Sequence, residues 1–141
     1  MLDSQLEPTQ GVPYAQLLGI VYNRQEGCYC LPFRPDLVGN AKLPALHGGV
    51  VAGFAETAAV LWLMRSESVQ GVPKPVDFSI DYLRSAGAQQ SFARCEVLKQ
   101  GRRVAQVVVR VWQQDPNALV AVARMHCLLP APAQSAEGGA T

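Results

Sequence analysis

The stretch that decides the fold is residues 47–64, which read His47-Gly48-Gly49-Val50-Val51-Ala52-Gly53-Phe54-Ala55-Glu56-Thr57-Ala58-Ala59-Val60-Leu61-Trp62-Leu63-Met64. Alanine and leucine are strong helix formers. Gly71, Pro73 and Pro75 follow closely and would end a helix. The stretch therefore predicts one helix that opens at His47 and reaches about residue 67. Because apolar residues occupy nearly every face of this helix, we expect it to be buried.

Candidate strands lie on both sides of this helix. Residues 19–22 and 28–31 predict two strands, and residues 76–82 alternate with a period of two. Runs at 91–98, 103–113 and 119–129 are separated by turn residues. A short amphipathic stretch at 13–18 predicts a helical turn, and the proline- and glycine-rich residues 32–46 predict a loop. The pattern predicts an α+β domain whose antiparallel sheet curls around the helix.

Composition excludes several classes of protein. The 141 residues suit one domain, and 49% are hydrophobic while only 16% are charged. The net charge of +1 gives no reason to expect a nucleic-acid or anionic-membrane partner. The longest near-apolar run, 50–64, is shorter than the roughly 20 residues of a membrane span. With no secretory signal in the opening residues, we expect a cytoplasmic protein.

The domain is expected to span residues 12–129, after a polar lead-in at 1–11 and before a disordered tail at 130–141. The sparse charge suggests that a second copy of the chain covers some apolar surface. Cys28, Cys30, Cys95 and Cys127 do not have the spacing of a zinc site. We expect four small buried thiols and no metal.

Glu56 is the most informative single residue. It lies in the middle of the apolar helix, between Phe54, Ala55, Ala58 and Ala59. Glutamate is almost never fully buried unless it is paired, and loss of water raises its pKa. Two interpretations stay open from the residues alone. Glu56 is either a functional carboxylate or a glutamate that meets solvent or an interface.

Gly48 and Gly49 open the helix. The first amides of a helix have no partner within it and can bind an anion or a developing oxyanion. The alternative is that two glycines merely permit a tight entry into the helix. His47 before them could hydrogen-bond the turn or be an ordinary loop histidine.

The spacing of these features has a consequence for assembly. Eight residues separate Gly48 from Glu56, which is about 12 Å of helix rise. One chain cannot easily bring both groups to the same substrate carbon. If both act in one reaction, two antiparallel copies of the helix must face each other in a two-fold dimer with two equivalent sites.

Residues 47–58 resemble the helix motif of hotdog-fold acyl-CoA thioesterases of the PaaI type, the phenylacetate-pathway and 4-hydroxybenzoyl-CoA thioesterase-like enzymes. That motif has His-Gly-Gly followed by an acidic residue nine positions after the histidine, as His47 and Glu56 are spaced. Residues 76–84 and 99–105 resemble the family's next strand and hairpin.

The resemblance implies a hotdog fold and hydrolysis of an acyl-CoA to a free acid and CoA. It implies Glu56 as nucleophile or general base, the Gly48 N–H as the donor to the thioester oxygen, and His47 as the residue that shapes the turn. It also implies sites built across a homodimer, with a homotetramer as a dimer of dimers, and no cofactor besides the CoA of the substrate.

Two positions depart from the family pattern. Many members have Asn or Gln six residues before the histidine, where this chain has Ala41; Asn40 is one residue further back. A one-residue loop insertion would place Asn40 in the carbonyl-polarising role. Some members carry a polar residue one turn after the acid, where this chain has Val60.

Substrate-binding candidates follow from the chemistry of acyl-CoA. The CoA phosphates need cations, and the second half of the chain is the basic half. Its candidates are Arg84 and the turn with Lys99, Arg102 and Arg103. Gly49 and Phe54 are further candidates beside the motif. We expect an apolar acyl pocket from Phe33, Leu43, Leu46, Phe54 and Trp62, of unpredicted acyl specificity.

Two other functions stay open. A non-catalytic acyl-CoA-binding module is possible on this fold, although Glu56 argues against it. An acyl-thioester hydratase or dehydratase would use a histidine paired with an acid, and His47 and His126 are the only histidines. No Gly-x-Ser-x-Gly elbow is present, so a serine-hydrolase route is excluded.

Overall fold

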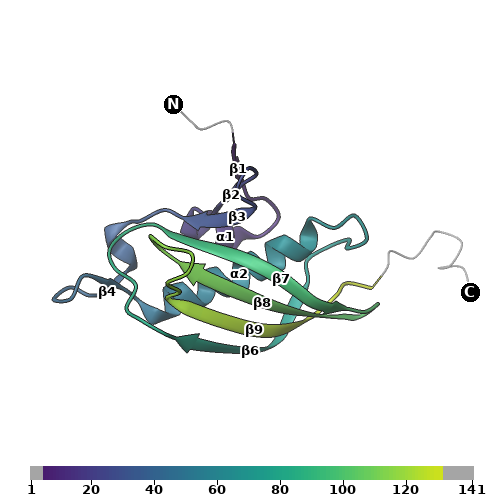
Figure 1. The fold of residues 1–141 in the computed structure, drawn as a ribbon. Helices are drawn as coiled ribbons and strands as arrows, with labels where there is room; N and C mark the ends of the chain where they lie inside the picture. The colour runs from purple at the N-terminus through teal and green to yellow at the C-terminus, as the bar shows by residue number, and fades with distance from the viewer. Residues whose placement is uncertain (1–4, 132–141) are drawn as a thin grey trace, which may run out of the picture.

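The computed structural model describes residues 5–131, which form one large sheet, a small two-stranded sheet and two α-helices (Figure 1). A short 3₁₀-helix, η1, spans Pro35–Leu37. In chain order, the other elements are β1 (Leu6–Pro8), α1 (Pro13–Leu18), β2 (Val21–Asn23), β3 (Cys28–Leu31), β4 (Val38–Asn40), β5 (Ala45–Leu46), α2 (Gly48–Met64), β6 (Lys74–Tyr82), β7 (Ser91–Gln100), β8 (Val104–Trp112) and β9 (Ala121–Leu128).

The large sheet has seven antiparallel strands in the order β1-β2-β3-β7-β8-β9-β6. Its four long strands, β6 to β9, are the ones that pack most extensively against α2. Figure 1 shows these strands curving along the length of α2. This arrangement is the hotdog fold and confirms the α+β prediction. It leaves β6, the strand that follows α2, at one edge of the sheet.

The core lies between α2 and the concave face of the sheet. Phe54 and Leu63 of α2 meet side chains of the central strands such as Val107, Val109 and Met125, all at most 2% exposed. The four cysteines are free and buried, as predicted. Among the described residues, no group of three or more His, Cys, Asp or Glu side chains could hold a metal ion.

The helix α2 begins where it was predicted and ends three residues earlier. His47 caps its start, because its Nδ1 accepts a hydrogen bond of 2.8 Å from the Gly49 N–H. At the other end the amides of Arg65 and Ser66 turn to the carbonyls three residues back. These tighter bonds are typical of the last turn of a helix, so the regular helix stops at Met64.

Several short elements differ from the prediction. Leu6–Pro8, expected within the loose lead-in, form β1 and pair with β2. Three residues show no readable periodicity, and β1 depends on long-range partners such as the ion pair of Glu7 with Arg65. The strand expected from residue 19 begins at Val21, because Gly19 ends α1 in the left-handed conformation.

Two further predictions concern the segments around this core. The expected loop at 32–46 carries η1 and the small hairpin β4–β5. The disordered tail expected at 130–141 lies outside the described residues from 132 onward. In the part of the chain that the structure describes, no helix is long and apolar enough to cross a membrane.

Candidate active site

The start of α2 offers one free backbone donor. The amides of Val50 and Val51 both turn to the carbonyl of His47, and the Gly49 N–H is taken by the His47 ring. The Gly48 N–H is the first of the helix and finds no acceptor among residues 5–131. The positive end of the helix dipole adds to its pull on an anion. The first turn therefore presents the Gly48 N–H to a ligand oxygen.

The peptide that follows this donor is held from both sides. Its carbonyl, on Gly48, accepts a hydrogen bond of 2.7 Å from the Tyr82 hydroxyl, and its N–H, on Gly49, donates to His47. Tyr82 lies at the end of the edge strand β6. It was missed in the sequence because only the fold brings it to a residue 34 positions away.

We expect His47 to contribute to stability through this cap. His47→Ala should lower the free energy of unfolding by about 1 kcal/mol, because it leaves the Gly49 N–H without its acceptor. His47→Asn should lose much less, since asparagine is a good N-cap. Urea unfolding of the two variants tests this, and equal stabilities would contradict a capping role.

Asn40 lies at the same end of α2 as His47 and Gly48. It is on β4, opposite Ala45 of β5, which immediately precedes the start of the helix. Its side-chain oxygen accepts a hydrogen bond of 3.0 Å from the Lys42 N–H. The side chain is exposed and closes its own turn. The structure thus brings Asn40 near the helix start, engaged in a local hydrogen bond.

A cavity of about 300 Å³ opens beside the helix start and joins two predicted residues. Gly48 and Arg84 both line it, together with Tyr82 and the buried Leu46. The Arg84 Nε donates a hydrogen bond of 2.9 Å to the carbonyl of Leu119. The guanidinium is therefore fixed beside the free amide of Gly48.

Glu56 lies two turns further along α2 and is partly buried. Among residues 5–131, no hydrogen bond or ion pair engages its carboxylate. It acts electrostatically on Cys127 of β9, whose pKa is raised to about 11 by burial first and by the charge of Glu56 second. Glu56 does not line the cavity that holds Gly48. Within one chain, the donor and the carboxylate are thus apart, as the helix rise predicts.

The residues expected to line one acyl pocket do not come together. Phe54 is 0% exposed and belongs to the core, so it presents no surface to a ligand. Leu43 is 71% exposed, Leu46 lines the cavity beside Gly48, and Trp62 lies near the other end of α2. Phe33 is at the surface. Their hydrophobic character made these residues candidates for the acyl pocket. It does not predict which side of the fold each side chain faces.

The two turn arginines lie at the far end of α2. Arg102 lines a cavity of about 350 Å³ with residues 67–70, which follow the helix, and Arg103 is exposed next to it. In a single chain this cationic turn and Gly48 are at opposite ends of the helix. Gly49 remains next to the site, bonded to His47.

His126 has an acidic partner, but away from the helix. Its Nδ1 lies 2.9 Å from the carboxylate of Asp77, and these hydrogen bonds lower the pKa of Asp77. The neighbouring Met125 and Cys127 face the core, so His126 faces the opposite side of the sheet from α2. This histidine–acid pair is exposed and does not meet the features at the helix start.

A curved antiparallel sheet wrapped around one long helix defines a protein of the hotdog fold. The chain belongs to the thioesterase superfamily, whose model matches residues 43–120, and it is a thioester hydrolase. The family resemblance of the helix motif is thereby confirmed.

The chain is similar to one relative of named activity and to two proteins of known structure. The chain is 30% identical over 120 residues to the medium/long-chain acyl-CoA thioesterase YigI of Salmonella typhimurium, a match that covers 74% of this chain and 77% of that protein. It is 45% identical to a protein of known structure from Chromobacterium violaceum, with 85% of each chain covered and a TM-score of 0.64. The fold also matches a Bacillus halodurans protein solved with CoA (21% identity, TM-score 0.70, 86% and 78% covered).

Proposed function

We propose that this chain hydrolyses acyl-CoA thioesters to a free acid and CoA in sites formed between two copies. The observation that carries the proposal is the unengaged Gly48 N–H at the start of the same helix that holds the unengaged carboxylate of Glu56. The Gly48 N–H polarises the thioester carbonyl, and the Glu56 carboxylate assists the attack on its carbon. Neither group has a competing partner among the described residues.

In the proposed reaction the thioester oxygen accepts a hydrogen bond from the Gly48 N–H. The negative charge that develops on this oxygen is stabilised by the amide and by the helix dipole. Glu56 then either takes a proton from an attacking water or attacks the carbonyl carbon itself. In both routes the C–S bond breaks, one water molecule is consumed, the acyl group leaves as the free acid, and the sulfur leaves as the CoA thiol.

Tyr82 and His47 orient the donor in this proposal. They hold the carbonyl and the N–H of the Gly48–Gly49 peptide, which fixes the first turn of α2. The Gly48 N–H then points in one direction before the substrate arrives. Pre-organised donors of this kind stabilise the transition state more than mobile donors do, because no reorganisation is needed during the reaction.

The helix geometry supports a site shared between two copies of the chain. Gly48 and Glu56 are separated by about 12 Å of helix rise, and a two-fold axis that sets two α2 helices antiparallel brings the partner's Glu56 toward Gly48. The edge strand β6 supports such a dimer. Among residues 5–131 it has no neighbouring strand on its outer side, and it carries the exposed apolar side chains of Val76 and Tyr82, followed by exposed Leu83.

The same dimer accounts for the two separated groups of arginines. With the partner's Glu56 opposite Gly48, the end of the partner's α2 lies about 12 Å beyond the start of the first helix. Arg84 beside Gly48 and the turn with Arg102 and Arg103 from the other copy would then flank one site. Guanidinium groups from both sides suit the phosphates of CoA.

Release of free thiol from a panel of acyl-CoAs tests the proposed function. The panel runs from acetyl to palmitoyl and includes aromatic acyl groups. We expect turnover, with the highest kcat/KM for medium or longer chains, the class named for the YigI relative. Turnover of no member of the panel would contradict the proposal and favour a binding module.

A further inference from the structure

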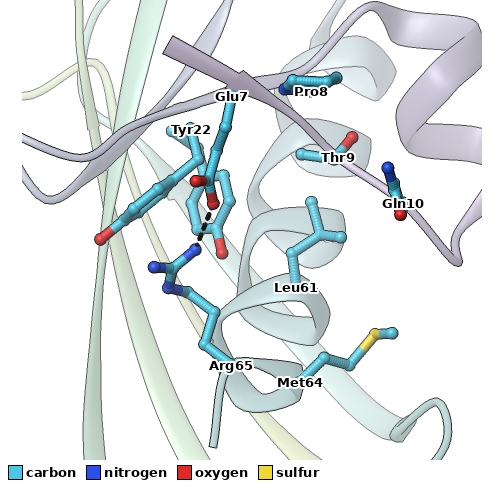
Figure 2. Close-up of a pocket in the computed structure, with 9 residues that line it drawn as sticks. Glu7, Pro8, Thr9, Gln10, Tyr22, Leu61, Met64 and Arg65 are labelled. Carbon is cyan, nitrogen blue, oxygen red and sulfur yellow. Dashed lines mark hydrogen bonds and ion pairs between the residues drawn. The ribbon is translucent and has the colours of Figure 1, made fainter. Parts of the chain in front are cut away.

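A third cavity, of about 430 Å³, lies at the other end of α2 from Gly48. Figure 2 shows it between the segment of β1 and the last turns of the helix. Leu61 and Met64 of α2 form an apolar side, and Tyr22 and Tyr29 of β2 and β3 form another. The cavity does not include Glu56 or any residue of the helix start.

The charged group at this cavity is already bound to a carboxylate. The Arg65 Nη1 lies 2.7 Å from a carboxylate oxygen of Glu7, as the dashed line in Figure 2 shows. The same guanidinium stacks on the ring of Tyr22, 3.9 Å from its centre. Both partners of the ion pair remain more than a third exposed, so a ligand can reach them. Glu7 belongs to β1, a strand of three residues at the sheet edge.

Tyr29 supplies the second polar group of this cavity. Its side chain is 2% exposed, and among residues 5–131 its hydroxyl makes no hydrogen bond. Every fully buried polar side-chain atom of the described residues has a hydrogen-bond partner. The Tyr29 hydroxyl has none among these residues, so it is not fully buried, and the surface that it exposes lies in the cavity. Burial raises the pKa of Tyr29, so the hydroxyl stays protonated and can donate. The charges of Arg65 and Glu7 both act on it.

We propose that this cavity is a binding site for an organic monocarboxylic acid with an apolar body. The ligand carboxylate takes the place of the Glu7 carboxylate on Arg65 and accepts a hydrogen bond from Tyr29. Its apolar body lies against Leu61 and Met64. Guanidinium, hydroxyl and apolar wall together match this class of ligand. The acid that the proposed reaction releases belongs to this class, although the site does not depend on that reaction.

The proposal predicts opposite effects for the two partners of the ion pair. Glu7→Gln removes the internal competitor, so octanoate should bind several-fold more tightly than to the wild type. Arg65→Gln should abolish detectable binding, and Tyr29→Phe should weaken it roughly fivefold, the value of one hydrogen bond. Tyr29→Phe keeps the ring that packs on Tyr22 at 4.9 Å between ring centres.

Titration calorimetry with octanoate, and with octanamide as the uncharged control, measures these affinities. The series is repeated in Glu56→Gln, where binding should be unchanged. The proposal is overturned if octanoate does not bind, if octanamide binds equally well, or if Glu7→Gln weakens binding. Loss of binding in Glu56→Gln would likewise overturn it, because the acid would then occupy the catalytic groove. Thermal unfolding of each variant checks that it is folded. If Arg65→Gln is unfolded, the octanoate affinities of Glu7→Gln and Tyr29→Phe test the proposed site.

Discussion

Glu56→Gln is expected to lower kcat for acyl-CoA hydrolysis by at least about 10²-fold. General-base catalysis contributes roughly 10²–10⁴-fold to a rate, and an amide can neither take the proton nor attack the carbonyl carbon. KM should change much less, because the carboxylate acts on the reacting atoms and not on the CoA. Initial rates of thiol release over a range of substrate concentrations measure both quantities.

The fold should survive this substitution. Glutamine has nearly the shape of glutamate, and among residues 5–131 the Glu56 carboxylate has no hydrogen bond or ion pair to lose. Glu26→Gln is the matched control, since it removes the same charge from an exposed turn between β2 and β3, away from both ends of the proposed site. Its kcat should stay within about twofold of the wild type. If Glu56→Gln behaves like this control, Glu56 is not catalytic.

An experiment on the active wild-type enzyme then tests the two roles proposed for Glu56, nucleophile and general base. In the nucleophilic route, water attacks an anhydride between substrate and enzyme, and attack at the enzyme carbonyl carbon leaves a solvent oxygen in the side chain. Repeated turnover in ¹⁸O-labelled water would therefore label the peptide that contains Glu56. In the general-base route this peptide stays unlabelled and the label enters the product acid alone. Mass spectrometry of the digested enzyme detects the label, and a labelled peptide establishes the nucleophilic route. An unlabelled peptide is expected both for the general-base route and for attack of water on the acyl carbon of the anhydride.

The long elements were predictable because each carries a local sequence signal over many residues. The helix α2 is apolar on nearly every face and is followed by Gly71 and Pro73, so its existence, start and burial follow from elementary propensity. The long strands β6 to β9 were predictable for the same reason. β1 was not, because three residues carry no period and their partners lie far along the chain.

The candidate site was predictable only where its chemistry is local. The free amide of Gly48 depends on its place at the helix start, and that place can be read from the residues. The hydrogen bond from Tyr82 to Gly48 depends on how β6 passes the helix, which no local pattern encodes. The residues of the expected acyl pocket lie in different parts of the fold for a related reason. Phe54 and Leu43 are both apolar, but Phe54 lies in the core and Leu43 lies at a hairpin tip.

Gly48→Pro tests the other half of the proposed site and should lower kcat by about 10²–10³-fold. Proline has no N–H, so the substitution deletes the donor, and loss of one oxyanion donor costs about this factor. The position suits proline, because Gly48 is the first residue of α2, where proline is favoured. The preceding His47 already has the extended backbone, φ −60° and ψ 133°, that a following proline requires.

Gly48→Ala is the control that keeps the donor. The atoms nearest to a Cβ at this position belong to the Tyr82 side chain, at 3.5 Å or more, which is ordinary contact. We expect Gly48→Ala to retain most of the activity and both variants to unfold at temperatures close to that of the wild type. Equal losses of kcat in the two variants would mean that bulk at position 48 matters and that the N–H does not.

The two inactive variants together decide whether the site is shared between chains. A heterodimer of Glu56→Gln with Gly48→Pro combines an intact Gly48 from one chain with an intact Glu56 from the other, so one of its two sites is complete. Equal amounts unfolded and refolded together give half heterodimers and should recover about a quarter of the wild-type activity. If both groups act within one chain, every chain in the mixture lacks one of them, and refolding recovers nothing.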